Sequence, residues 1–172
     1  YDFKIVNSVM QVNNAQKVSI VRKMENYYGT DDFTGKTFGM WGLSFKPETD
    51  DIREAPALYI AEELVKQGAK LLAYDPEAIG TFKQATSQQV LDNTRFVHKQ
   101  EDALDDIDAL VICTEWNEFR RPTVDNFNDV MKQPVIFDGR NLYNLDRARK
   151  AGITYISVGR PTVNEAVLEP AE

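Results

Sequence analysis

The residues best suited to chemistry in this sequence are two cations, Lys46 and Arg140, each of which follows an apolar run typical of a β-strand. Open α/β sheets bind ligands outside the carboxyl ends of their strands, so both cations are expected at one edge. Arginine offers bidentate hydrogen bonds and lysine a compact point charge, a combination that suits a phosphate or diphosphate. The alternative is that each cation simply pairs with acidic neighbours, which are Glu48, Asp50, Asp51, Glu54 and Asp138.

Lys46 lies in a long charged segment, residues 42–56, between a predicted strand and a predicted helix. Such a connection usually needs only about two to six residues, and a longer one at a strand end is typical of ligand binding. The glycine pattern of a dinucleotide site, G-x-G-x-x-G, is absent here. We therefore expect a dinucleotide-binding type of fold that does not hold NAD in the usual way.

Five other residues have both a functional and a structural interpretation. Asp75 stands where a ribose-binding acid is often found, but Asp-Pro is also an ordinary end of a strand, which we favour. Cys113 lies inside an apolar run and is expected to be a buried strand residue rather than a reactive thiol. His98 has no spaced partner for a triad or a metal and is expected at the surface. Trp116 and Phe119 fit base stacking and loop packing equally well.

Composition narrows the class of protein. The 172 residues carry a net charge of −7, which argues against a general nucleic-acid binder. No apolar run approaches the roughly 20 residues that span a bilayer, so no membrane partner is expected. One cysteine and one histidine argue against a disulfide framework and a Cys/His metal site, and they suit the reducing cytoplasm.

The hydrophobic pattern predicts an α/β fold of Rossmann-like, doubly wound type, with a mainly parallel sheet preceded by a long helix. The helix covers residues 3–28, about 39 Å at 1.5 Å per residue, and either joins domains or subunits or packs in the core. The chain starts without Met inside this pattern, so we expect a piece of a longer protein. The polar tail from Gly159 is expected to fray. Six strands are predicted at residues 36–43, 71–74, 95–97, 109–113, 135–138 and 153–157, and helices at 56–67, 77–92, 102–106, 126–131 and 145–151.

The charged segment 42–56, with the sequence GLSFKPETDDIREAP, resembles the signature of the UDP-glucose/GDP-mannose dehydrogenase family. Three other segments resemble the same family in the same order. They are VNNAQK at residues 12–17, VICTEW at 111–116 followed by Glu118-Phe119, and FDGRN at 137–141. The resemblance covers nearly the whole chain. Its loop and its Thr-Glu-Trp triplet are most similar to members that act on UDP-glucose.

The resemblance implies an enzyme with an N-terminal NAD-binding domain, a central helix that forms a homodimer, and a C-terminal domain for the nucleotide end of the sugar. Residues 1–30 would be the end of the central helix and residues 31–172 the UDP-sugar-binding domain. The family converts UDP-glucose to UDP-glucuronate in two NAD-dependent oxidations through a cysteine thiohemiacetal. Its catalytic cysteine, catalytic lysine and NAD loop lie upstream, so no catalytic residue is assigned here and this chain alone is expected to be inactive.

The family's binding residues carry over to four positions. Phe45, Lys46 and Arg140 would contact the UDP-sugar, and Arg53 would reach NAD held by the other domain, where this chain alone offers it no partner. From the residues alone, Arg53 could equally be a solvent-exposed or ion-paired arginine. There are two alternatives to a domain that binds UDP-glucose. The chain could be the same domain of a UDP-N-acetylmannosamine or GDP-mannose dehydrogenase, or a stand-alone nucleotide-binding or dimerisation module without catalysis.

Overall fold

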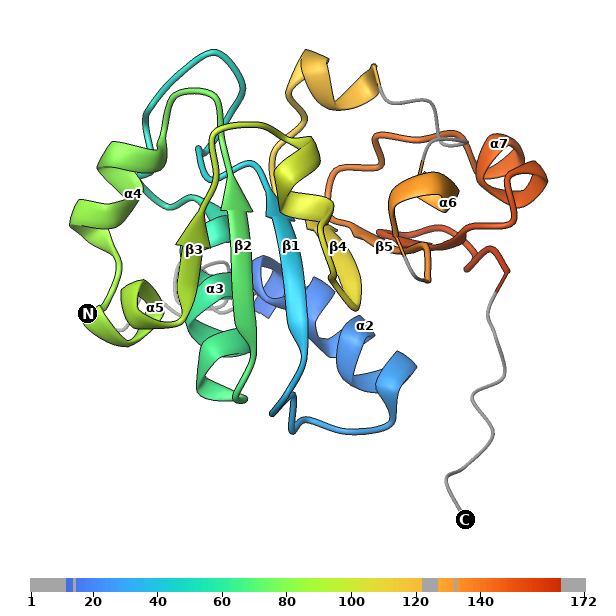
Figure 1. Ribbon diagram of the computed structural model, residues 1–172, viewed down its shortest axis with the longest axis horizontal. Helices are drawn as coiled ribbons and strands as arrows, with labels where there is room; N and C mark the ends of the chain where they lie inside the picture. The colour runs from blue at the N-terminus through green and yellow to red at the C-terminus, as the bar shows by residue number, and fades with distance from the viewer. Residues whose placement is uncertain (1–11, 14, 122–126, 132, 165–172) are drawn as a thin grey trace, which may run out of the picture.

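A six-stranded parallel sheet forms the centre of the computed structural model, which describes residues 12–13, 15–121, 127–131 and 133–164 (Figure 1). The strands lie in the order β3-β2-β1-β4-β5-β6, which is the order of a dinucleotide-binding fold. The predicted fold class is confirmed, and the predicted strand ends differ by no more than one or two residues. The strands are β1 Thr37–Trp41, β2 Lys70–Tyr74, β3 Thr94–Phe96, β4 Ala109–Ile112, β5 Val135–Asp138 and β6 Thr154–Ser157.

Helices cover both faces of the sheet. One face packs against α2 (Ser19–Tyr28), α3 (Pro56–Lys66), α4 (Ile79–Ala85) and α5 (Gln88–Asp92). The other face packs against α6 (Phe127–Val130), α7 (Leu145–Lys150) and two 3₁₀ turns, η1 (Glu101–Leu104) and η2 (Asn117–Arg120). Every residue of β4 is buried, because this strand lies between β1 and β5 and is covered on both faces.

The N-terminal helical pattern is interrupted, which corrects the prediction of one continuous helix. Residues 3–11 lie outside the described part of the chain, and beyond them the helix breaks at Val18, between helical residues 15–17 and α2. The carbonyl of Val18 starts α2 afresh by accepting bonds from Val21 and Arg22. The two pieces have different surroundings, because α2 buries Ile20, Val21 and Met24 against the sheet and the polar residues before Val18 line a cavity.

The tail does not fray where the structure describes it, so that expectation was wrong for residues 159–164. Val163 pairs with Tyr155 in an antiparallel bridge and is buried. The Asn164 amide donates hydrogen bonds to main-chain carbonyls at the end of α7 and just beyond it. Polar side chains hold this segment, because they satisfy backbone acceptors that a helix end leaves open.

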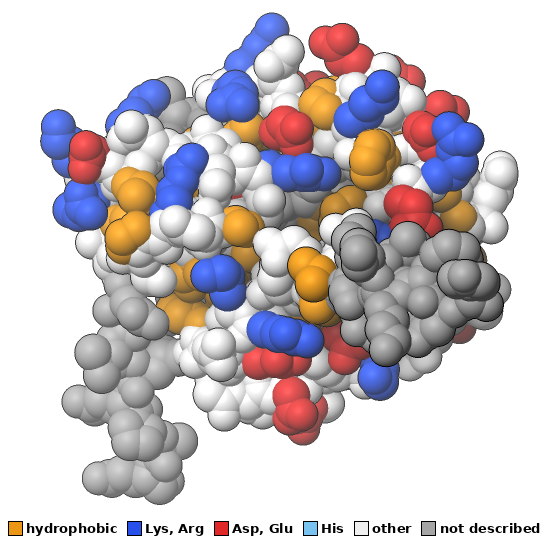
Figure 2. Space-filling view, turned by 180° about the vertical axis from the view of Figure 1, so that it is seen from behind, with side chains coloured by type: hydrophobic (Ala, Val, Ile, Leu, Met, Phe, Trp, Pro, Cys, Tyr) orange, Lys and Arg blue, Asp and Glu red, His pale blue; other side chains and the backbone are white. Residues whose placement is uncertain are grey.

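Charged side chains of both signs are interspersed on the face turned away in Figure 1 (Figure 2). Over the described part of that face they form no continuous basic surface, which agrees with the net charge of −7. Within the described ranges, no helix is long and apolar enough to cross a membrane. The described side chains also include no cluster of three His, Cys, Asp or Glu that could hold a metal ion.

Candidate functional site

A cavity of about 630 Å³ lies at the carboxyl edge of the sheet, beside the ends of β4 and β5. Its position matches the place where the strand order reverses, between β1 and β4, which is where this class of sheet binds ligands. The volume falls in the range of small-molecule sites, about 300–1,000 Å³. Its walls come from the N-terminal helical segment, from the loop after β1 with the start of α3, and from the turn after β5.

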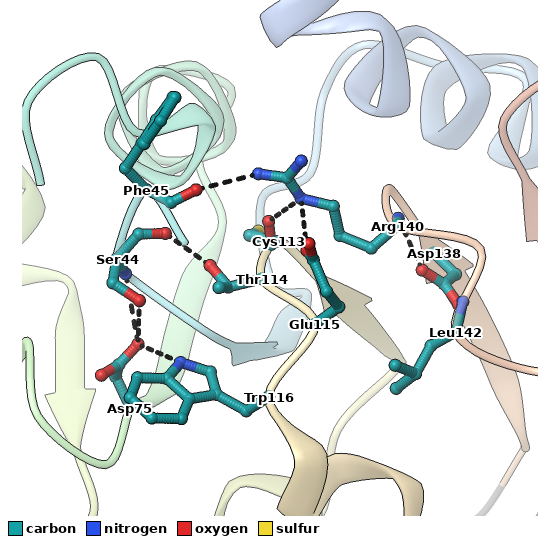
Figure 3. A network of polar contacts seen from close by, with 10 residues as sticks. All are labelled: Ser44, Phe45, Asp75, Cys113, Thr114, Glu115, Trp116, Asp138, Arg140 and Leu142. Atoms are coloured by element: carbon teal, nitrogen blue, oxygen red, sulfur yellow. Dashed lines mark hydrogen bonds and ion pairs between the residues drawn. The ribbon is translucent and has the colours of Figure 1, made fainter. Parts of the chain in front are cut away.

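Arg140 ties three strand ends together at this cavity (Figure 3). Its Nε donates to the carbonyl of Cys113 at 2.8 Å and its Nη2 to the carbonyl of Phe45 at 3.2 Å. The Glu115 carboxylate is 3.1 Å from Nε. The backbone N–H of Arg140 donates to Asp138, so the turn that carries it is anchored to the end of β5. The guanidinium is therefore held in a fixed direction beside the cavity.

The structure brings Phe45 and Arg140 together at the cavity but places Lys46 outside its wall. Phe45 lines the cavity, and 46% of its surface is exposed, so its ring is open to a ligand. Lys46 is exposed and is not among the residues that form the cavity wall. Its nearby positive charge contributes, after Arg53, to lowering the pKa of Asp51. The expected convergence of Lys46 and Arg140 on one point is not seen, and their binding roles remain predictions.

Arg53 points into solvent from the same loop, with 88% of its side chain exposed. It forms a bidentate pair with Asp51, Nε to Oδ1 at 2.9 Å and Nη2 to Oδ2 at 2.7 Å. This hydrogen bonding lowers the pKa of Asp51 to about 2. Arg53 is thus both exposed and ion-paired within its own loop, and its contact with a cofactor remains a prediction.

Asp75 is the buried anchor of the loop and not a free ribose-binding acid. Its Oδ2 accepts from the N–H groups of Leu43 at 2.6 Å, Ser44 at 3.2 Å and the Trp116 indole at 3.2 Å. Its Oδ1 accepts from the N–H groups of Glu77 and Ala78. Asp75 is 2% exposed, so the acceptor capacity of its carboxylate is used inside the protein. The interpretation of Asp75 as a strand end missed this network.

Comparison with known protein families identifies the same segments of the chain. The model of the UDP-glucose/GDP-mannose dehydrogenase family, UDP binding domain, matches residues 39–145, more than half of the chain. The chain belongs to this family. The match includes the loop after β1, Asp75 and Arg140, whereas the N-terminal helical wall of the cavity lies outside the matched residues.

Relatives within the family share the fold and much of the sequence. A UDP-glucose 6-dehydrogenase of Bacillus subtilis is 42% identical over 163 residues, which are 95% of this chain and 36% of that protein. The structure of a UDP-glucose dehydrogenase from Pyrobaculum islandicum superimposes with a TM-score of 0.69 at 27% identity, over 89% of this chain and 32% of that one. A UDP-N-acetyl-mannosamine dehydrogenase from Staphylococcus aureus gives 0.65 at 26%, over 92% and 34%. The chain spans about a third of the length of these relatives.

The aromatic residues after β4 pack in the core of the UDP-binding domain, so loop packing is the correct alternative for them. Phe119 is fully buried and stacks on Trp41 with ring centroids 5.0 Å apart. Trp116 is 7% exposed, and its indole N–H donates a hydrogen bond to the Asp75 carboxylate. His98 is exposed at the surface, as predicted.

Sequence reasoning missed Lys17, which lines the cavity from the N-terminal helical segment and forms an ion pair with Glu54. The available signals were a polar interruption in a helical pattern and the resemblance of residues 12–17 to a family motif. Such an interruption shows that residues leave the core face without indicating what they contact.

Cys113 of the UDP-binding domain is expected to be chemically inert in the folded protein. It is 2% exposed, and burial raises the pKa of its thiol to about 12, so almost no thiolate forms at neutral pH. A disulfide reagent such as dithiobis-nitrobenzoate should leave the native protein unlabelled at pH 8 and label one thiol in urea. Rapid labelling of the native protein would show that the thiol is accessible and contradict the buried interpretation.

Proposed function

We propose that this chain is the C-terminal UDP-sugar-binding part of an NAD-dependent UDP-glucose 6-dehydrogenase, which converts UDP-glucose to UDP-glucuronate in two oxidations. The observation that carries the proposal is the fixed Arg140 guanidinium beside a ligand-sized cavity in a UDP-binding domain. A guanidinium has five N–H donors. Its contacts with Cys113, Glu115 and Phe45 engage Nε and Nη2, so the N–H groups of Nη1 can meet the diphosphate.

In this proposal the protein supplies binding and orientation. Arg140 offsets the negative charge of the diphosphate, and its bonds to the main chain keep the guanidinium in the same position whether or not the ligand is bound. The exposed Phe45 ring offers an apolar face to the base or the ribose. Lys46 adds an exposed positive charge on the loop after β1, outside the cavity wall. The oxidation itself is carried out by residues in the rest of the full-length enzyme, which this chain does not span.

The dinucleotide does not fit the sheet of this domain in the usual way. The segment after β1 lacks the glycine pattern, and Asp75 is occupied by Leu43, Ser44 and Trp116. We propose that NAD is bound by a separate domain and reached by the exposed Arg53. The same proposal assigns residues 1–30 to a dimer-forming central helix, residues 31–172 to the substrate domain, and the enzyme to the cytoplasm.

Two alternatives remain for the substrate. The structural likeness to a UDP-N-acetyl-mannosamine dehydrogenase keeps that sugar as the second candidate, and GDP-mannose is the third. Calorimetric titration of the full-length enzyme with UDP, GDP, UDP-glucose and UDP-N-acetylmannosamine separates them. We expect UDP and UDP-glucose to bind and GDP to bind much more weakly. Preference for GDP or for the N-acetyl sugar would overturn the assignment.

This chain alone is expected to form no NADH from UDP-glucose and NAD. In this proposal the nucleophile and the NAD loop lie in the part of the full-length enzyme that this chain does not span, and Cys113 is buried. Absorbance at 340 nm over an hour at micromolar protein should stay at the level of a blank without protein. Steady NADH formation by the purified chain would show that the reacting groups lie within these 172 residues.

A further inference from the structure

A three-residue contact joins the N-terminal helical segment to the end of the loop after β1. Lys17 forms an ion pair with Glu54, and its ammonium lies 4.3 Å from the ring centroid of Tyr59 in α3. The Tyr59 hydroxyl donates to the same Glu54 oxygen at 3.4 Å. The Lys17 side chain is 14% exposed, whereas that of Glu54 is 69% exposed. The lysine ammonium thus contacts both Glu54 and Tyr59, and we call this three-residue contact the Lys17 clasp.

The clasp acts on a backbone position that needs support. Glu54 has a φ of +60°, the left-handed region that a residue with a side chain adopts only under constraint. The N–H of Ala55 closes a turn onto Ile52 at 3.0 Å, immediately before α3 begins. A charged hydrogen bond to Lys17 lowers the pKa of the Glu54 carboxyl and raises that of the ammonium, so both groups stay charged at neutral pH.

The residue before Glu54 is Arg53, which is exposed and bonded to Asp51 of the same loop. Because its ion pair is internal to the loop, nothing in that pair fixes the loop relative to the rest of the protein. The clasp links the end of the loop to the N-terminal helical segment, which also forms one wall of the cavity. We propose that Lys17 is a positioning residue that holds the end of the loop, and with it Arg53, in the direction required for the reaction.

This inference rests on the proposed function for its kinetic consequence, and it also has a structural consequence that does not. In the purified chain, Lys17→Met should speed hydrogen exchange of the amides at residues 51–55 by about tenfold and leave β4 and β5 unchanged. In the full-length enzyme, the same change should raise KM for NAD about tenfold, with KM for UDP-glucose within twofold of the wild type. Lys17→Arg, which keeps the charge, should restore most of both properties.

Two further variants separate positioning from direct binding or general stability. Glu54→Gln should change loop exchange and KM for NAD in the same direction as Lys17→Met, and the two effects should not add in the double variant, because both single changes remove the same ion pair. Arg22→Met, an exposed cation on α2, is the matched control and should change neither readout. Unchanged loop exchange in Lys17→Met, or a rise only in KM for UDP-glucose, would overturn the positioning role. A wild-type enzyme with no activity on UDP-glucose would overturn the proposed function and leave the exchange test standing.

Discussion

Replacing Arg140 by alanine in the full-length enzyme is expected to weaken UDP-glucose binding by about 100-fold or more. A charge-assisted hydrogen bond contributes about 1.5–3 kcal/mol, and about 1.4 kcal/mol corresponds to a factor of ten. Loss of two such bonds to a diphosphate accounts for that factor. Arg140 also holds Phe45 through its carbonyl, so the substitution removes the charge and loosens the loop together. Calorimetric titration with UDP-glucose measures the effect.

Substitutions at other cations provide the comparisons for the affinity of Arg140→Ala. Arg149→Ala is the matched control, because this arginine is 57% exposed on α7, pairs only locally with Asp146 in the salt bridge that the structure describes, and does not line the cavity. Arg140→Lys should recover only part of the affinity, since lysine lacks the planar fork that reaches two acceptors. Lys46→Ala should weaken binding by less than Arg140→Ala, because Lys46 lies outside the cavity wall. Affinity of Arg140→Ala within threefold of the wild type would remove Arg140 from the site.

Arg140 could be found from the sequence because its position depends on local features. An apolar run followed by Asp-Gly-Arg indicates a buried strand and a turn at its carboxyl end, and parallel strands bring such ends to one edge. The fold was predictable for the same reason, since alternating strand and helix patterns leave few topologies open. The strand β5 was predicted with the bounds that the structure has.

The contacts of three residues could not be predicted from the sequence, namely those of Lys17, Lys46 and Asp75. Their surroundings are made by segments far apart in the chain, 37 residues apart for Lys17 and Glu54 and 41 for Asp75 and Trp116. Spacing along a helix or strand gives the face on which a side chain lies, but not its partner on another element. Lys46 follows a strand as Arg140 does, yet it lies outside the cavity wall, and no local pattern in the sequence distinguishes the two positions.

Asp75 provides the second large effect, because its carboxylate organises the start of the loop. Asp75→Ala is expected to lower the free energy of unfolding of the purified chain by about 3–5 kcal/mol. It would leave the buried N–H groups of Leu43, Ser44 and Trp116 without an acceptor, and each such loss costs about 1–3 kcal/mol. Urea unfolding followed by tryptophan fluorescence measures the change. Asp146→Ala, an exposed carboxylate on α7, should change it by less than about 1 kcal/mol.

Asp75→Asn distinguishes the anchor from a ligand-binding acid. The amide keeps the volume but carries one acceptor oxygen and an NH₂ group that faces donors, so the variant should also lose stability, by about 2 kcal/mol or more. An acid that served a ribose would behave in the opposite way, because its removal would weaken ligand binding while stability stayed the same. Wild-type stability of Asp75→Asn combined with weakened nucleotide binding would therefore reassign Asp75 to the site. A stability loss instead identifies Asp75 as the support of the start of the loop, next to Phe45, through its bonds to Leu43 and Ser44.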